Sequence, residues 1–200
     1  MAREDARKNQ ESNTGFTETV MLYLHDAVYL LITVLIIFLL VFRIIIVSGD
    51  SMRLTLVDGD YLLLLNNLFY QEPQQGDVVV ISKKAFDNGA PIVKRVVATE
   101  GQTVDIDFEA GVVYVDGQAL EEPYINNPTH NNLGTKFPLV VEENCIFALG
   151  DNRSVSRDSR DPIIGQIDTR EVLGKALYLF FPGTDKGQTG RVYDRIGVIK

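Results

Sequence analysis

A continuous apolar run from Ala27 to Val47 is the feature that most limits how this chain of 200 residues can fold. Only Thr33 and Arg43 interrupt it, and about 20 such residues suffice to cross a bilayer as a helix. Arg43 lies near the end of the run, where its long side chain can reach the polar interface. A cleavable signal peptide has an apolar region of only about 7 to 15 residues before its cleavage site. We therefore expect a retained transmembrane anchor over residues 27–47, with a buried core helix as the alternative.

The anchor divides the chain into a short first part and a long second part. Residues 1–26 begin as a mixture of acidic and basic side chains without an apolar period, which is typical of a disordered tail. Residues 48–200 can form one modest domain, since a hydrophobic content of 46% permits a real core. The formal net charge of -8 argues against a nucleic-acid partner, which would favour a basic face.

The second part has the pattern of a mainly β protein. Short apolar segments rich in β-branched residues alternate with turns that contain Gly, Asp or Asn, and this favours a coiled antiparallel β-sheet or barrel over an alternating α/β fold. One short helical turn is expected at residues 168–171. The expected strands are residues 61–65, 78–81, 91–98, 103–108, 112–115, 145–149 and 176–181.

Ser51 is a candidate nucleophile, because it lies four residues beyond the apolar run and between Asp50 and Met52. A serine hydroxyl attacks a carbonyl only if a neighbouring base takes its proton. Both histidines are poorly placed, since His25 precedes the apolar run and His130 lies in a polar stretch. The base must therefore come from another residue type.

Lys94 is the better candidate for this base. It lies in an expected strand, where it shares a face with Ile92, Val96 and Ala98 while Arg95 points to the other face. A free lysine titrates near 10.4, but burial among apolar side chains can lower its pKa by roughly 3 to 5 units. The alternative is an edge strand that carries two solvated cations.

A polar, charge-alternating loop at residues 150–160 follows the apolar strand at residues 145–149. Together with three other short stretches, this loop resembles the conserved boxes of type I signal peptidases. The resemblance covers residues 20–182 and includes one apolar segment ahead of the boxes. The four stretches, in chain order, are Ser51 with Met52, Gly76-Asp77 with the three valines after it, Lys94 with Arg95, and Gly150-Asp151-Asn152-Arg153 continuing to Arg160.

The resemblance implies a membrane-bound Ser/Lys protease that removes signal peptides from exported proteins. Ser51 would be the nucleophile, and Lys94 would be the general base and later the general acid. Ser156 would orient the Lys94 amine, and an ion pair between Asp158 and Arg160 would hold the loop. The supporting residues, which orient the base, hold the loop or line the site, are Ser156, Asp158, Arg160, Arg95, Met52, Gly150, Asp151, Asn152 and Arg153.

The resemblance also implies the partners and the location. These are the signal peptides of secreted preproteins, the lipid bilayer and, transiently, an export translocon, with no nucleic acid and no cofactor. The single anchor and short insertions are similar to the Gram-positive branch. The N-terminus would then be cytoplasmic, and the catalytic domain would lie on the outer side of the cell membrane. No Cys/His cluster has metal-ligand spacing, and a calcium site at Asp151 and Asp158 is a weak alternative.

The chain departs from the family pattern beside the nucleophile. Leu54 stands where the family usually has proline, so the turn after Ser51 can be looser. Gly49 stands where some members have a serine whose hydroxyl completes the oxyanion hole. We therefore expect the oxyanion to be held chiefly by the backbone N–H of Ser51, because Ser48 is one residue too early for that role.

Two other functions remain open from the sequence. One is a specialised Ser/Lys processing protease, for pilus or sortase-linked substrates or as a self-cleaving sensor that resembles LexA-type proteases. The other is a catalytically silent membrane-anchored β-domain that binds export substrates or scaffolds an envelope complex. The presence of Ser51, Lys94 and Ser156 together argues against a silent domain, whereas Leu54 keeps that possibility open.

Overall fold

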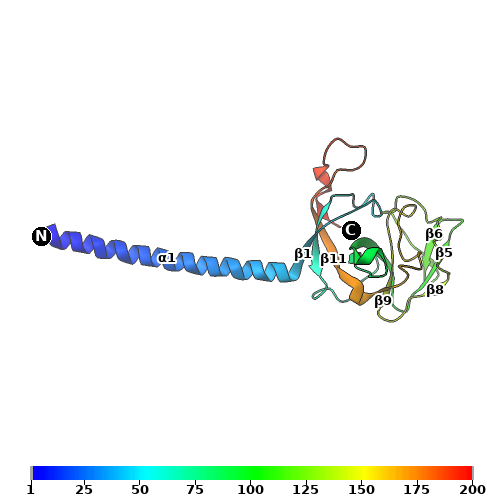
Figure 1. Ribbon diagram of the computed structural model, residues 1–200, viewed down its shortest axis with the longest axis horizontal. Helices are drawn as coiled ribbons and strands as arrows, with labels where there is room; N and C mark the ends of the chain where they lie inside the picture. The colour runs from blue at the N-terminus through cyan, green and yellow to red at the C-terminus, as the bar shows by residue number, and fades with distance from the viewer. Residues whose placement is uncertain (1, 200) are drawn as a thin grey trace. The chain divides into compact units, whose positions relative to one another are not determined.

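The computed structural model describes residues 2–199 and the side chains of residues 19–199. The chain forms two compact units, Met1–Val41 and Phe42–Lys200. Figure 1 shows the described part of the first unit as the single helix α1 (Ala2–Val41). Its part Thr19–Val41 has 23 residues and is apolar enough to cross a membrane. At a rise of 1.5 Å per residue this part is about 34 Å long, which matches the hydrocarbon core of a bilayer.

The expected anchor, residues 27–47, extends beyond the end of the helix. The helix stops at Val41, and Phe42–Ile46 is strand β1 of the second unit. Three consecutive isoleucines, residues 44–46, explain this, because β-branched side chains are stiff and favour strands. Arg43 consequently pairs with Leu64 in a sheet and does not end a spanning helix.

The beginning of the helix also differs from the sequence prediction. A disordered tail is expected over residues 1–26, whereas the backbone of α1 is helical from Ala2 onward. Extending a helix that already exists costs far less than nucleating one, since each added residue contributes a hydrogen bond. Once the apolar segment is helical, the helix can therefore extend into the polar residues that precede it.

The second unit contains two antiparallel sheets, as predicted for a mainly β domain. The larger sheet has eight strands, with β1 at one edge and β10 at the other. Its order is β1 (Phe42–Ile46), β2 (Tyr61–Asn66), β11 (Val172–Phe181), β3 (Val78–Ile81), β4 (Ile92–Thr99), β9 (Cys145–Leu149) and β10 (Ile167–Asp168), with β12 (Gly197–Val198) paired to β11.

The smaller sheet has four strands in the order β7-β6-β5-β8. Figure 1 shows β5, β6 and β8 together at the side of this unit away from β1 and β11. These strands are β5 (Thr103–Asp107), β6 (Val112–Val115), β7 (Gln118–Ala119) and β8 (Leu139–Val140), and the short 3-10 turns are η1 (Asp87–Gly89), η2 (Thr169–Glu171) and η3 (Tyr193–Arg195). The expected helical turn is therefore present as η2, where the Asp168 side chain accepts a hydrogen bond from the backbone N–H of Arg170.

The core follows from the alternation of side chains along the strands. In β2, Leu62 and Leu64 are fully buried, while their neighbours along the strand are only partly covered. Leu68 and Phe69, which come just after β2, are exposed. The leucines of β2 therefore contribute to the core, and Leu68 and Phe69 form the exposed apolar surface next to this strand.

Candidate active site

Ser51 lies in the loop between β1 and β2, which we call the nucleophile loop (residues 47–60). Its two ends are tied together, because the Val47 N–H donates to the Asp60 carbonyl at 2.8 Å and the Gly59 N–H donates to the Val47 carbonyl at 2.9 Å. Gly49 has a φ of 87°, a left-handed conformation that favours glycine. These contacts turn the chain sharply enough to present Ser51 at the end of β1.

Lys94 reaches Ser51 from strand β4. Its Nζ lies 2.9 Å from the Ser51 Oγ and 2.8 Å from the backbone carbonyl of Val93, and only 2% of the residue is exposed. Burial lowers the Lys94 pKa from 10.5 to about 8, although the negative charges of Asp158 and Asp151 act in the opposite direction. A much larger fraction of this lysine than of a free one is therefore neutral near pH 8, and its amine is within proton-transfer distance of the serine.

The simple alternation expected along β4 is only partly right. Arg95 is as buried as Lys94, with 1% of the residue exposed, so neither cation is solvated. The register between β4 and β9 shifts between Val96 and Ala98, where one extra residue is inserted. Such a bulge moves the side chains that follow it to the other face of the strand. Ala98 is expected from the sequence to share the face of Lys94, but the bulge places it on the opposite face.

Arg95 is held by the Asp151 carboxylate. Its Nε and Nη2 donate to the two carboxylate oxygens of Asp151 at 2.9 and 2.8 Å, and its Nη1 donates to the Gly76 carbonyl at 2.9 Å. Its guanidinium carbon also lies 4.0 Å from the centre of the Tyr124 ring. A bidentate ion pair thus joins β4 to the start of the 150–160 loop on the opposite side of the strand from Lys94.

The start of the 150–160 loop touches the nucleophile loop directly. The Asn152 N–H donates to the Ser51 carbonyl at 2.9 Å, and its side-chain amide donates to the Asp50 carbonyl at 3.0 Å. A side chain at Gly150 would collide with the Ser51 carbonyl and with the Ser156 side chain. Gly150 and Asn152 therefore determine how closely this loop approaches the nucleophile.

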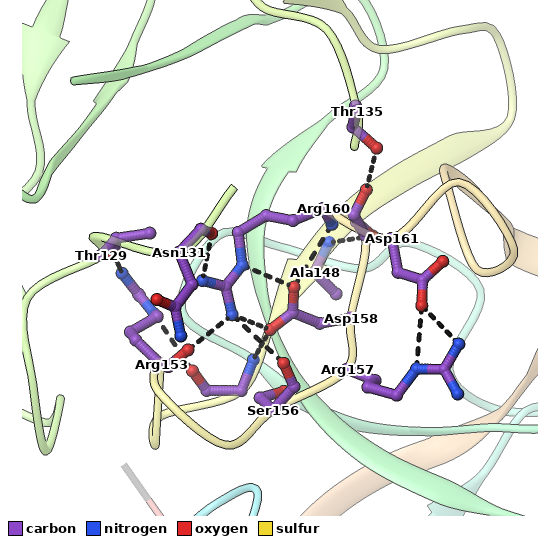
Figure 2. Close-up of polar contacts among 12 residues, drawn as sticks. Thr129, Asn131, Thr135, Ala148, Arg153, Ser156, Arg157, Asp158, Arg160 and Asp161 are labelled. Carbon is purple, nitrogen blue, oxygen red and sulfur yellow. Dashed lines mark hydrogen bonds and ion pairs between the residues drawn. The ribbon is translucent and has the colours of Figure 1, made fainter. Parts of the chain in front are cut away.

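The rest of the 150–160 loop is organised around two buried arginines. Figure 2 shows the Arg160 guanidinium against the Asp158 carboxylate, with Nε to Oδ1 at 2.8 Å and Nη2 to Oδ2 at 2.9 Å. Arg160 also donates to the carbonyls of Asn131 and Arg153 at 3.1 and 2.9 Å. Arg153 forms a second buried ion pair with Glu122. The expected pair of Asp158 and Arg160 is thus present.

Ser156 and Met52 lie beside the site, but neither makes the contact expected of it. Ser156 is expected to hydrogen-bond to the Lys94 amine, and Met52 is expected to line the site. Ser156 is buried, and its Oγ has no hydrogen-bond partner within the described residues. The expected hydrogen bond from this hydroxyl to Lys94 is therefore not formed here. Met52 is 1% exposed and packs in the core with Val47, Leu56 and Val93, so it supports the nucleophile loop from beneath.

Several residues of this site were not singled out from the sequence. Thr55 donates to Asp151 at 2.5 Å, Glu122 pairs with Arg153, and Tyr124 covers Arg95. The only local signal was for Thr55, which belongs to the same short stretch as Ser51. Glu122 and Tyr124 lie in a long irregular loop, and no sequence pattern indicates which strand such a loop covers.

The backbone N–H groups beside Ser51 limit the choice of oxyanion donors. The Gly49 N–H donates to Asp58 Oδ1 at 2.8 Å, so we still expect the Ser51 N–H to be the donor to the oxyanion.

The acidic side chains near the site do not form a metal site. Within residues 19–199, no group of three or more His, Cys, Asp and Glu side chains could hold a metal ion. Asp151 and Asp158, the weak calcium candidates, are each paired with an arginine instead.

A buried lysine amine beside a serine hydroxyl, on a mainly β domain, is the arrangement of a serine–lysine hydrolase. Comparison with known families gives the same class, because residues 20–181 match the family described as signal peptidase, peptidase S26. The chain belongs to this family, whose members hydrolyse peptide bonds. With its apolar N-terminal helix, the chain is a membrane-anchored member of it.

Two curated relatives agree with this assignment. A protein of Synechocystis sp. named "Probable signal peptidase I-1" is 38% identical over 72% of this chain and 74% of its own length. Signal peptidase I of Bacillus licheniformis is 30% identical over 86% of this chain and 95% of its own length. A crystal structure of a signal peptidase I from Enterococcus faecalis aligns at 29% identity, with 52% of this chain and 96% of that chain covered and a TM-score of 0.42.

Proposed function

We propose that this chain removes signal peptides from exported preproteins, with Ser51 as nucleophile and Lys94 as general base. The observation that carries the proposal is the 2.9 Å distance between Lys94 Nζ and Ser51 Oγ, together with a lysine pKa of about 8. A buried lysine beside a serine is costly to keep, and such perturbed groups are concentrated at functional sites.

The first half of the reaction forms an acyl-enzyme. Neutral Lys94 takes the proton of the Ser51 hydroxyl while the oxygen attacks the carbonyl carbon of the scissile peptide bond. The backbone N–H of Ser51 stabilises the negative charge on the carbonyl oxygen. The Lys94 ammonium then gives its proton to the leaving nitrogen, so the mature protein departs with a neutral amine and the signal peptide stays as an ester on Ser51.

The second half of the reaction restores the enzyme. Lys94, now neutral again, takes a proton from a water molecule that attacks the ester carbonyl. Collapse of the intermediate breaks the bond to Ser51 Oγ, and the lysine returns the proton to that oxygen. One water is consumed for each peptide bond cut, and the signal peptide leaves as a carboxylic acid that releases its proton to the solvent.

The sheet offers an edge at which an extended substrate can bind near this pair. Strand β1, which leads directly into the nucleophile loop, is the outermost strand of the larger sheet and is paired with β2. Among residues 2–199, Ile92 and Val93 have strand partners in β3 alone, because the pairing of β4 with β9 begins at Arg95. An added peptide strand would pair at the outer edge of β1 or of the first residues of β4, as in other cases of strand addition.

The proposed topology follows from the substrate. A signal peptide in a bilayer presents its cleavage site just beyond the hydrocarbon core, and a tethered enzyme meets it at high effective concentration. The catalytic domain would therefore face the outer side of the cell membrane, with the N-terminus in the cytoplasm and transient contact with an export translocon.

Cleavage of a purified preprotein by the full-length protein in detergent tests this function, with the cut position read by mass spectrometry. We expect one cut, after a small residue at the end of the signal peptide, and none with Ser51→Ala as the blank. An intact preprotein after incubation with wild type would favour a silent binding domain. A cut within a folded mature region would favour a protease with another purpose.

The rate of cleavage is expected to rise with pH. Only the neutral amine of Lys94 can accept the serine proton, so kcat/KM should increase about tenfold per pH unit below pH 8 and level off above it. A pH–rate profile without an inflection between 7 and 9 would contradict the assignment of Lys94.

The stability of the fold should also depend on pH through Lys94. Its pKa in the folded state lies below the unfolded value of 10.5, so folding releases protons between pH 8 and 10.5. The contribution of Lys94 to stability therefore rises from pH 8 to 10.5 and is smallest below pH 8.

A further inference from the structure

Residues 183–199, which we call the C-terminal segment, lie beyond the part of the chain that matches the family. This segment returns to the nucleophile loop after strand β11. Its contacts there include hydrogen bonds, ion pairs and the packing of Ile199 against the core cluster that contains Met52 and Leu56. A segment outside the shared family region thus borders the loop that carries Ser51.

The strongest of these contacts are made to Asp60, the last residue of the nucleophile loop. Asp60 is fully buried, and both of its carboxylate oxygens are used. Oδ1 accepts from the Gly183 N–H at 2.7 Å and from Arg195 Nη1 at 2.9 Å. Oδ2 accepts from the Val57 N–H at 2.8 Å and from Arg195 Nη2 at 2.6 Å. Arg195 is therefore the cation that neutralises this buried carboxylate, and it comes from 135 residues further along the chain.

Asp60 connects Arg195 to both ends of the nucleophile loop. The backbone carbonyl of Asp60 accepts the hydrogen bond from Val47, where the loop begins. Arg195 Nη2 also donates to the Thr55 carbonyl at 3.2 Å, in the middle of the loop. One guanidinium thus fixes the middle of the loop directly and its two ends through the Asp60 residue.

Two outer ion pairs join the C-terminal segment to the residues on either side of Ser51 and Met52. Asp185 lies 3.2 Å from the Arg53 guanidinium, and Lys186 pairs with Asp50. These pairs are partly exposed, and exposed pairs contribute little to stability. Their placement around the nucleophile nevertheless restricts the same loop that Arg195 holds from inside.

We propose that Arg195 is a positioning residue, which acts through Asp60 to keep Ser51 Oγ at hydrogen-bond distance from Lys94 Nζ. The inference rests on the proposed function, because it concerns the geometry of the same serine and lysine. A displacement of about 1 Å between reacting groups can cost about 100-fold in rate. Loss of Arg195 should therefore slow the chemical step more than it weakens substrate binding.

The test compares Arg195→Gln with wild type and with Arg191→Gln, a matched control. Arg191 lies on the same segment, but its guanidinium stacks over the Phe181 ring and forms no ion pair with any of residues 19–199. We expect Arg195→Gln to lower kcat by about 10- to 100-fold, with KM changed by less than about twofold. Arg191→Gln should leave both constants unchanged. Arg195→Lys, which keeps the charge but not the planar fork, should recover part of the rate.

Hydrogen exchange read by mass spectrometry gives a measurement that does not depend on activity. In Arg195→Gln, peptides that cover residues 47–60 should exchange faster than in wild type, while peptides that cover β5 and β6 should not change. If Arg195→Gln does not fold, the double variant with Asp60→Asn removes the unpaired buried charge. That double variant should fold, and it should still be slow because the guanidinium is missing.

The outcomes separate the inference from the proposed function. A kcat of Arg195→Gln equal to that of wild type would overturn the positioning role. Faster exchange throughout the second unit would do so as well, because it would indicate general destabilisation. A wild type that cuts no preprotein would overturn the proposed function, and the exchange measurement would still decide whether Arg195 holds the loop.

Discussion

Ser51→Ala, Lys94→Met and the double variant should all lose preprotein cleavage by the same large factor, at least about 10³ in kcat. The two side chains act as one unit, since the Ser51 hydroxyl is a poor nucleophile unless the Lys94 amine takes its proton. Removing either one therefore removes the acyl-enzyme route, and removing the second costs nothing further. Quenched-peptide or preprotein assays with enough enzyme to follow slow turnover would measure these rates.

The fold of Lys94→Met should survive the loss of activity. Methionine has a similar length, and the lysine carries a buried amine whose charged form is costly in this position. We expect the midpoint of thermal unfolding at pH 7 to be unchanged or higher. A matched control is Lys83→Met, because Lys83 is a partly buried lysine of the same unit that pairs with Glu171 outside the site. Lys83→Met should keep full activity.

Two results would contradict this view of the pair. Cleavage by Lys94→Met at more than about a tenth of the wild-type rate would mean that another group serves as the base. A double variant much slower than either single variant would mean that the two residues contribute independently, which the 2.9 Å contact does not allow.

Most of the strands could be predicted from the sequence, because each combines β-branched residues with a turn that has its own signal. Strands β2, β3, β5 and β6 begin or end within one residue of the expected limits, since Asp, Gly or Asn turns bound them. Strand β1 is harder to predict for a physical reason. Its residues are as apolar as the helix before them, so the β-branched run at residues 44–46 indicates a strand only together with the pairing to β2.

The candidate site shows the same division between local and long-range information. Ser51, Lys94 and the 150–160 loop could be found because their residues form short recognisable stretches. The bulge in β4, the ion pair of Arg95 with Asp151 and the cover provided by Tyr124 depend on which segments pack together. Asp60 and Arg195 likewise form a pair that no local pattern indicates, since 135 residues separate them.

Replacement of Arg160 by methionine is expected to give the largest loss of stability. Asp158, which is fully buried, receives two hydrogen bonds from the Arg160 side chain and one from the Gly150 N–H at 3.1 Å. Removing the guanidinium leaves a buried carboxylate without its counter-charge, which typically costs about 3 to 5 kcal/mol. Chemical denaturation with urea would measure this loss. The control Arg170→Gln, which breaks a largely exposed pair with Asp168, should stay within about 0.5 kcal/mol of wild type.

The double variant with Arg160→Met and Asp158→Leu distinguishes the cost of an unpaired charge from the value of the ion pair itself. If the loss in Arg160→Met comes from the stranded Asp158 carboxylate, replacing that carboxylate by an apolar side chain should recover most of the stability. Activity should not recover with it, because Arg160 also donates to the carbonyls of Arg153 and Ser156 and so fixes the loop beside Lys94. A double variant as unstable as Arg160→Met would show that these backbone hydrogen bonds, and not the charge of Asp158, make Arg160 necessary for the fold.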